Sequence, residues 1–360
     1  MLKFVLGVVL SLLLVAGPGA VAAAKADDVT AATPKKAKRI KIVKRHPVVR
    51  NSAGRVTAAP ARPRLVKRVV MVRGKRQVTY ARVVVSAPAV PTMGDLAGLN
   101  LTRDPLDLKS SVALVLDQSN SEVLFEKNSN VALPIASITK LMTALIVVEA
   151  QQDMNEMLTI TDDDVDREKF SSSRLKPGIE MRRTDMLHIA LMSSENRAAS
   201  ALGRNYPGGR PAFVAAMNAK AHELGMNDTH YVDSNGLSSQ NVASAHDLAR
   251  LIMQAYQQPL LRQYSTDAKA TIEASGRPMT FGTTNYLVAM PDWDIGLQKT
   301  GFINEAGRCM VMQAMIAGRA VIMVFLDSKG KQSRTADAGR MRKWLEALKP
   351  ATASATMPGG

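Results

Sequence analysis

The chain has 360 residues, a formal net charge of +16 and one cysteine, and 46% of its residues are hydrophobic. A single cysteine excludes an intrachain disulfide, so the fold must be stabilised by its core. The positive charge comes from residues 25–82, which hold eighteen Lys and Arg against Asp27 and Asp28, while the rest of the chain is close to neutral. This distribution excludes a uniformly basic nucleic-acid-binding domain, and we expect no nucleic-acid partner.

The first 26 residues have the order of a secretory signal peptide: Lys3, an apolar run over 4–15, and small residues ending near Ala24. We therefore expect residues 1–26 to be cleaved near Ala24 or Ala26 and the mature protein to be periplasmic. An uncleaved N-terminal anchor is the alternative, although the apolar run is too short to span a bilayer comfortably.

Residues 27–105 are rich in Lys, Arg, Val, Ala and Pro and contain Tyr80 as their only aromatic residue. Such a composition does not build a packed core, so we expect a basic flexible segment with one hairpin turning at Gly74. Residues 35–82 would adhere to an anionic envelope polymer or a membrane surface, or would serve only as a solvated spacer. The sequence leaves both interpretations open.

Residues 106–350 have the pattern of one globular domain, and we expect the tail over 351–360 to be disordered. The predicted strands form a pair at each end of the domain: 112–116 with 122–126, and 308–316 with 320–326. The predicted helices span 133–150, 183–202, 211–224, 245–256 and 334–348. This order predicts an α/β (α+β) fold in which a mixed sheet, closed by the two ends of the domain, carries an inserted helical subdomain.

The pattern Ser-x-x-Lys occurs three times, beginning at Ser137, Ser173 and Ser328. Only Ser137 opens an apolar helical run, since Ser173 lies in a polar stretch before Pro177 and Ser328 in a turn-like one. Residues three apart on a helix are neighbours, so Lys140 can reach the hydroxyl of Ser137. The apolar setting lowers the pKa expected for Lys140 toward that of a general base, which a weak serine nucleophile needs.

Two further short patterns follow along the chain. Ser194 and Asn196 form a Ser-x-Asn pattern in an apolar-flanked run, and Lys299, Thr300 and Gly301 end a strand-like run. The charge of Lys299 and the hydroxyl of Thr300 suit a substrate carboxylate. Gly301 would leave room for an extended peptide along the strand edge.

These three patterns in this order resemble the penicillin-recognising serine hydrolases, whose motifs are Ser-x-x-Lys, Ser-x-Asn and Lys-Thr-Gly. Residues 105–350 are similar to the D-alanyl-D-alanine carboxypeptidases and endopeptidases, notably in the stretches beginning at Leu133, Leu191 and Leu297. Glu195, at the centre of the middle motif, resembles the small periplasmic endopeptidases. The resemblance implies a β-lactamase/transpeptidase-like fold: an antiparallel sheet flanked by helices, with an inserted helical subdomain.

The resemblance also implies a role for each catalytic residue. Ser137 would attack the D-Ala carbonyl, and Lys140 would accept its proton. Ser194 would return a proton to the leaving amine, while Asn196 would hold Lys140 and the substrate amide.

Substrate binding is implied in the same way. Lys299 and Thr300, with Gly301 beside them, would bind the carboxylate beyond the scissile bond, and the backbone N–H groups of Ser137 and Phe302 would form an oxyanion hole. The expected protein is a serine D,D-peptidase that hydrolyses peptidoglycan stem peptides through an acyl-enzyme. It would be inhibited covalently by β-lactams and would need no cofactor.

Several alternatives remain. Endopeptidase cleavage of D-Ala cross-links is preferred to carboxypeptidase activity because of Glu195 and because no anchor or second domain follows Leu348. A β-lactamase would need a deacylating carboxylate; Glu223 with Asn227 has a suitable spacing, but Gly225 marks a helix end there. The last alternative is a catalytically silent wall-binding protein recruited by its basic segment.

The remaining candidate residues have simpler interpretations. The five His residues show no metal-ligand spacing, so we expect no metal. Cys309 is interpreted as a small buried residue of a strand, and Asn285 as a turn cap.

Overall fold

The computed structural model describes residues 64–72, 75–83 and 90–348. The predicted signal peptide over 1–26, much of the basic segment and the tail over 351–360 lie outside these residues. None of the described helices combines the length and the hydropathy needed for a membrane span. The chain divides into two units, Met1–Ala87 and Pro88–Gly360.

The first unit contains the hairpin predicted around Gly74. Its strands are β1 (Arg64–Val72) and β2 (Lys75–Val83), paired antiparallel with Val72 opposite Lys75. The turn residues 73–74 lie outside the described part of the chain. The pairing extends over nine residues of each strand, so the predicted hairpin is confirmed.

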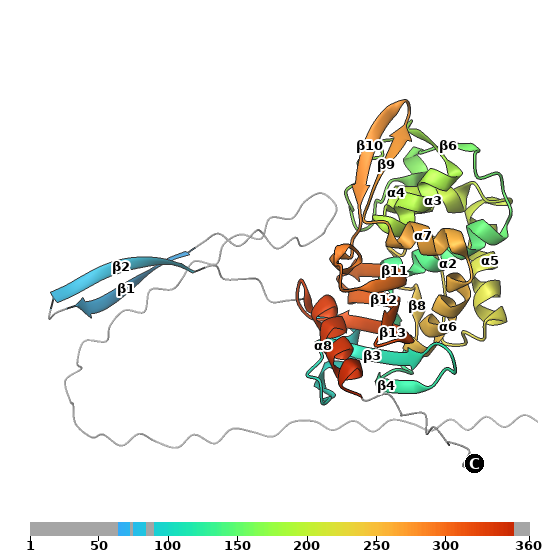
Figure 1. The fold of residues 1–360 in the computed structure, drawn as a ribbon. Coiled ribbons are helices and arrows are strands. Elements are labelled where there is room, and N and C mark those ends of the chain that lie inside the picture. The colour runs from blue at the N-terminus through green and yellow to red at the C-terminus, as the bar shows by residue number, and fades with distance from the viewer. Residues whose placement is uncertain (1–63, 73–74, 84–89, 349–360) are drawn as a thin grey trace, which may run out of the picture. The chain divides into compact units, whose positions relative to one another are not determined.

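The second unit is built on a five-stranded antiparallel sheet in the order β11-β12-β13-β3-β4 (Figure 1). Its strands are β3 (Ser110–Asp117), β4 (Val123–Lys127), β11 (Asp294–Ile303), β12 (Gly307–Ile316) and β13 (Arg319–Ser328). β3 from the start of the domain pairs with β13 from its end, with Leu114 opposite Val324. The two predicted strand pairs are confirmed, but the sheet is antiparallel throughout rather than mixed.

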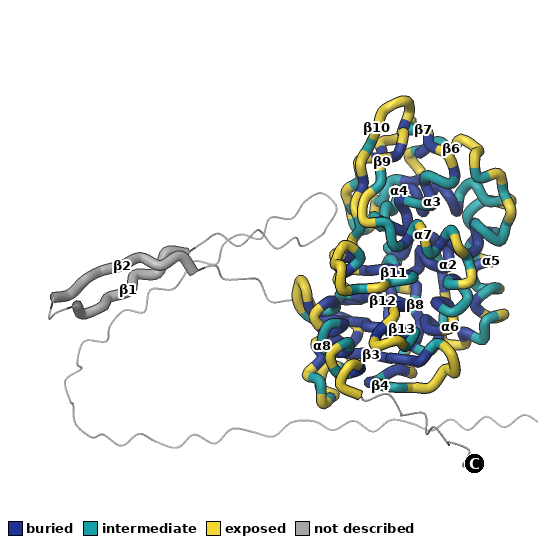
Figure 2. The backbone as a smooth tube through the Cα atoms, in the orientation of Figure 1, coloured by how far each residue is buried: buried dark blue, intermediate teal, exposed yellow. Residues whose placement is uncertain are grey.

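The sheet separates two hydrophobic cores. Leu114 and Val324 face the larger core, whereas Val115 and Phe325 face a smaller one that includes Met341 of α8 (Ser333–Ala347). All eight residues of β3 are buried because both faces of the sheet are covered, and Figure 2 shows this central burial. A strand that is buried on both faces has a continuous run of apolar residues, and residues 112–116 of β3 form such a run.

Most helices cover the face of the sheet opposite α8 (Figure 1). They are α2 (Thr139–Glu149), α3 (Arg183–Met192), α4 (Asn196–Arg204), α5 (Gly209–Glu223), α6 (Ala245–Tyr256) and α7 (Pro259–Thr266). Short paired strands join them: β5 (Leu133–Pro134) with β8 (Val242–Ala243), β6 (Met157–Thr159) with β7 (Glu180–Arg182), and β9 (Lys269–Ala274) with β10 (Arg277–Gly282). The inserted helical subdomain is therefore confirmed.

Two predicted helices are wrong in their extent. The helix predicted over 133–150 begins only at Thr139, because residues 133–134 pair with β8 and a 3₁₀ turn, η2 (Ala136–Ile138), intervenes. The helix predicted over 183–202 is broken at residues 193–195, where Ser194 has a φ of 61°. Hydrophobic periodicity continues across both irregularities, so the pattern alone does not reveal them.

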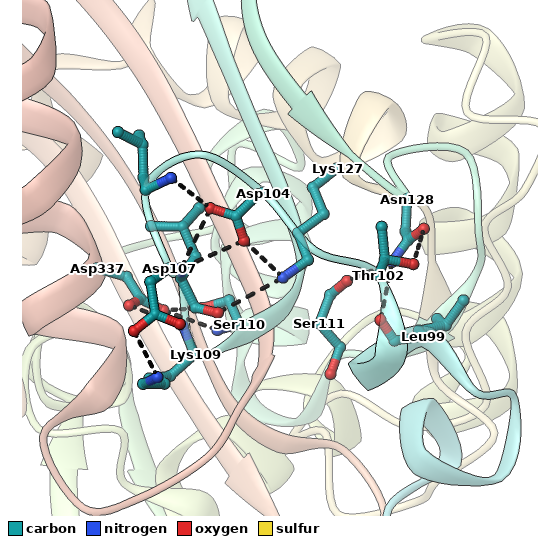
Figure 3. A network of polar contacts seen from close by, with 12 residues as sticks. Leu99, Thr102, Asp104, Asp107, Lys109, Ser110, Ser111, Lys127, Asn128 and Asp337 are labelled. Carbon is teal, nitrogen blue, oxygen red and sulfur yellow. Dashed lines mark hydrogen bonds and ion pairs between the residues drawn. The ribbon is translucent and has the colours of Figure 1, made fainter.

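A polar network fastens the first residues of the domain to its last helix (Figure 3). Lys127 of β4 forms an ion pair of 2.9 Å with Asp104, and both side chains are only 5% exposed. Asp337 of α8 accepts hydrogen bonds from the N–H groups of Lys109 and Ser110 and from the Ser110 hydroxyl at 2.6 Å.

The described structure of this unit also includes α1 (Met93–Leu96) and η1 (Leu99–Leu101), which precede the boundary expected at residue 106.

Candidate active site

Ser137 lies in a strained turn rather than in the first turn of an α-helix. Ala136 before it has a φ of 49°, an uncommon backbone conformation for a residue with a side chain, and Ser137 itself lies in η2. The Thr139 hydroxyl donates to the carbonyl of Ala136 at 2.8 Å, which fixes this turn from the helix that follows. The turn places the Ser137 side chain at the entrance of α2, as the sequence predicts, although by a different backbone path.

Lys140 is the centre of the arrangement. Its Nζ lies 2.8 Å from Ser137 Oγ and 2.7 Å from Asn196 Oδ1, and it also donates to the carbonyl of Asn235. The side chain is fully buried, and this loss of solvation lowers the pKa of Lys140 to about 7, although the charge of Asp233 opposes the shift. An amine with this pKa can accept a proton near neutral pH, so the geometry suits a general base acting on Ser137.

A second contact between a lysine and a serine lies on the sheet side of the site. Lys299 of β11 is buried, and its Nζ donates to Ser194 Oγ at 2.8 Å and to the carbonyl of Thr300 at 2.9 Å. Burial lowers the pKa of Lys299 well below its usual value, and the nearby charges of Lys140 and Arg334 lower it further. Ser194 reaches Lys299 because the helix is broken between α3 and α4, so the error in the predicted helix falls on a residue that the resemblance implies to be catalytic.

Thr300 makes a contact that the sequence analysis overlooked. Its hydroxyl lies 2.6 Å from that of Thr284, a residue that precedes η4 (Tyr286–Ala289). Thr284 is held in turn by its N–H group, which donates to the carbonyl of Met192 at the end of α3. Neighbouring Asn285 caps η4 through Leu287 N–H, which confirms the turn-cap interpretation. No periodic pattern marks Thr284, and only the short polar stretch over 282–285 pointed to this region.

Glycine is required at two places where backbones meet beside Ser137. A Cβ at Gly301 would lie 2.8 Å from the carbonyl oxygen of Ile135 and 3.1 Å from the nitrogen of Ser137. A Cβ at Gly236, which has a φ of 78°, would lie 2.1 Å from the carbonyl oxygen of Ala136. The missing side chain of Gly301 therefore allows β11 to approach the Ser137 turn, and the expectation that it also makes room for substrate stays a prediction.

Asn196 connects the site to the loop before β7. Its Nδ2 donates to Ser171 Oγ at 3.0 Å while its Oδ1 accepts from Lys140. In the same loop Lys169 forms an ion pair with Glu305, which follows β11. This pair links the helical side of the site to the sheet side, and Ser171 is a second contact that sequence reasoning missed.

The other copies of the sequence patterns lie elsewhere. Ser173 is in a loop, where its hydroxyl accepts from Leu175 N–H, and Ser328 is buried at the end of β13 beside Asp337. Glu223 lies at the end of α5, where it pairs with Lys220 and its side chain is 64% exposed. Neither Ser173 nor Ser328 shows a lysine contact like that of Ser137 among the described hydrogen bonds.

Cys309 lies inside β12 and is completely buried, as predicted. Burial raises the pKa of its thiol to about 12, so the reactive thiolate is not formed near neutral pH. Within the described residues, no group of three or more His, Cys, Asp or Glu side chains is arranged to hold a metal ion.

Comparisons with known proteins agree with the fold and with this chemistry. A family model described as D-alanyl-D-alanine carboxypeptidase matches residues 100–330. D-alanyl-D-alanine endopeptidases from Pseudomonas aeruginosa and Escherichia coli are 48% and 40% identical; the matches cover 69% and 73% of this chain and 80% and 86% of the relatives. A solved D-alanyl-D-alanine carboxypeptidase from Mycobacterium tuberculosis has a TM-score of 0.62 and 26% identity over 74% of this chain and 96% of its own.

A second solved structure is informative about inhibitors. A penicillin-binding protein from Listeria monocytogenes with cefotaxime bound has a TM-score of 0.60 and 28% identity, over 67% of this chain and 98% of its own.

Proposed function

The chain belongs to the D-alanyl-D-alanine carboxypeptidase family, and we propose that this serine D,D-peptidase hydrolyses the D-alanyl bonds of peptidoglycan with Ser137 as its nucleophile. The observation that carries the assignment of Ser137 is the contact of 2.8 Å between its Oγ and the buried amine of Lys140. A serine hydroxyl is a weak nucleophile at neutral pH, and an adjacent base is what activates it.

In the first half of the reaction, neutral Lys140 accepts the hydroxyl proton while Ser137 Oγ bonds to the carbonyl carbon of D-Ala. The amide C–N bond then breaks, and the leaving amine takes a proton from Ser194, which regains one from Lys299. The proton accepted by Lys140 restores Lys299, so Lys140 is neutral again. Water afterwards attacks the resulting ester while Lys140 accepts a proton from the water, and Lys140 gives this proton to Ser137 Oγ as the ester C–O bond breaks. The proton path needs both short contacts between a lysine amine and a serine hydroxyl that the site contains.

Substrate binding follows from the edge strand. We assign Lys299 and Thr300 to the carboxylate beyond the scissile bond and Asn196 to the amide on the acyl side. The oxyanion would lie between the N–H groups of Ser137 and Phe302. Support comes from the close approach at Gly301, which brings the backbone of β11 beside the nitrogen of Ser137. Fixed donors aimed at a developing oxyanion are usually a large contribution to catalysis.

Endopeptidase action on D-Ala cross-links is the activity favoured, because the relatives named above at 48% and 40% identity carry that name. Digestion of purified cross-linked dimeric muropeptides, analysed by mass spectrometry, tests this assignment. The expected products are two monomers. If the enzyme leaves the dimers intact and only releases D-Ala from pentapeptide monomers, it is a carboxypeptidase.

β-Lactams are expected to acylate the same serine. The related Listeria structure holds cefotaxime, and β-lactams would meet the same nucleophile and carboxylate-binding residues here. A chromogenic cephalosporin distinguishes this enzyme from a β-lactamase. Acylation that stops after one equivalent is expected, whereas rapid turnover would contradict the assignment.

We also assign the protein to the periplasm and its basic segment to an anionic partner. Support for an anionic partner is the charge of this segment, since residues 25–82 hold eighteen Lys and Arg against Asp27 and Asp28. Co-sedimentation with anionic lipid vesicles and with purified cell-wall sacculi tests the partner. Binding that weakens as salt increases is expected, and no binding at low salt would leave the segment as a spacer.

A further inference from the structure

A cleft of about 350 Å³ opens next to the catalytic residues but contains none of them. Its walls include Ser193 and Glu195, the two neighbours of Ser194, together with Phe281 and Gly282 at the end of β10. Arg174, from the loop before β7, completes it. The volume is at the lower end of the range for ligand pockets, so the cleft can accept part of a peptide.

The position of the cleft relates it to one end of the substrate. Ser194 contacts Lys299, and Thr284, two residues after Gly282, contacts Thr300. The cleft therefore adjoins the residues assigned to the carboxylate beyond the scissile bond. Phe302, whose N–H group is assigned to the oxyanion hole, is not among its walls. A group lying in the cleft would belong to the part of the substrate that leaves.

The guanidinium of Arg174 is fixed in a position that suits an anion. One of its terminal nitrogens donates to the carbonyl of Thr280 at 2.6 Å, and its guanidinium lies 4.4 Å from the centre of the Phe281 ring. Stacking on an aromatic ring fixes the plane of a guanidinium and leaves its other N–H groups for a carboxylate. In the described part of the chain Arg174 has no ion pair, although Glu195 lies in the same cleft.

From this geometry we propose that the cleft is a subsite for the second stem peptide of a cross-link and that Arg174 binds a carboxylate of that stem. The inference rests on the proposed function, because only a cross-link places a second stem on the leaving side. When the leaving group is a single D-Ala, its carboxylate is held by Lys299 and Thr300 and nothing extends into the cleft. Arg174 is then a specificity-determining residue for cross-links.

The test compares two substrates with one enzyme. Arg174→Gln should lower kcat/KM for cross-linked tetrapeptide dimers by roughly tenfold or more, since hydrogen bonds to charged groups are among the stronger ones. Release of D-Ala from pentapeptide monomers and acylation by a fluorescent penicillin should stay within about twofold, because neither places a group in the cleft. Lys176→Gln, which removes another exposed cation two residues away and outside the cleft, is the matched control and should change neither activity.

Each outcome is decisive. If the dimer and the pentapeptide lose activity equally, the cleft serves the acyl side or the fold, and the proposal is wrong. If the ratio of dimer cleavage to pentapeptide cleavage is the same for Arg174→Gln as for the parent enzyme, Arg174 does not bind the second stem. If the parent enzyme itself does not cleave dimers, the proposed endopeptidase function fails first, which separates the two conclusions.

Discussion

The pH dependence of acylation is the most revealing property of this site. Lys140 must be neutral to accept the Ser137 proton, so the rate constant for acylation should rise with pH as the amine loses its own proton. Burial lowers the pKa of Lys140 from 10.5 to about 7. The neutral fraction is then about 1% at about pH 5 and about 90% at about pH 8. Acylation should therefore increase roughly a hundredfold over this range and level off near its upper end.

Stopped-flow acylation by a fluorescent penicillin measures this profile. A falling limb at alkaline pH is also expected, because the pKa of Lys299 is lowered by burial and its charge is needed for the substrate carboxylate. The two lysines interact, so the midpoints belong to the pair. Lys140→Arg keeps the charge but cannot serve as a base, and should lose on the order of 10² to 10⁴ in rate at every pH. A parent rate that keeps rising in proportion to hydroxide past about pH 9 would refute a lowered pKa for Lys140.

Three substitutions test the supporting structure. Gly236→Ala should reduce the free energy of unfolding by at least about 2 kcal/mol in urea melts and slow penicillin acylation, because its Cβ would meet the Ala136 carbonyl and its φ is 78°. Thr284→Val should slow acylation about fivefold by removing the hydroxyl contact with Thr300, and Thr284→Ser should restore it. The buried carboxylate of Asp164 forms ion pairs with Arg204 at 2.9 Å and with Arg210 at 3.1 Å. Asp164→Ala should lower the free energy of unfolding by about 3 kcal/mol at neutral pH because both arginines lose their partner. Burial alone would raise the pKa of Asp164, but hydrogen bonds, foremost the one from Arg204, hold the pKa below 3.8. The difference in unfolding free energy between parent and variant should therefore shrink only as pH falls through that lowered pKa.

Local rules were enough to predict the contact between Ser137 and Lys140. Ser137 and Lys140 are three residues apart, and this spacing brings them together even though the turn between them is 3₁₀ rather than α-helical. The apolar run after Lys140 correctly implied burial, from which the lowered pKa follows. The two strand pairs were visible for the same reason, since each is formed by neighbours in the chain.

The parts that escaped prediction depend on distant segments. The carbonyl of Asn235, the hydroxyl of Ser171 and that of Thr284 all reach the site from loops whose path is set by tertiary packing. The packing role of Gly301 was missed because the sequence cannot show that β11 passes against the Ser137 turn. The break at Ser194 was missed because apolar residues flank it on both sides, so periodicity predicts one helix where two are present.

The nucleophile itself can be tested by intact-mass spectrometry after incubation with benzylpenicillin. The parent protein should gain the mass of one penicillin molecule, and peptide mapping should locate the adduct on Ser137. Ser137→Ala should remain folded, judged by an unchanged melting temperature, and should gain no mass. An adduct of equal yield on the Ser137→Ala protein, or none on a folded parent protein, would contradict the assignment of Ser137 as the nucleophile.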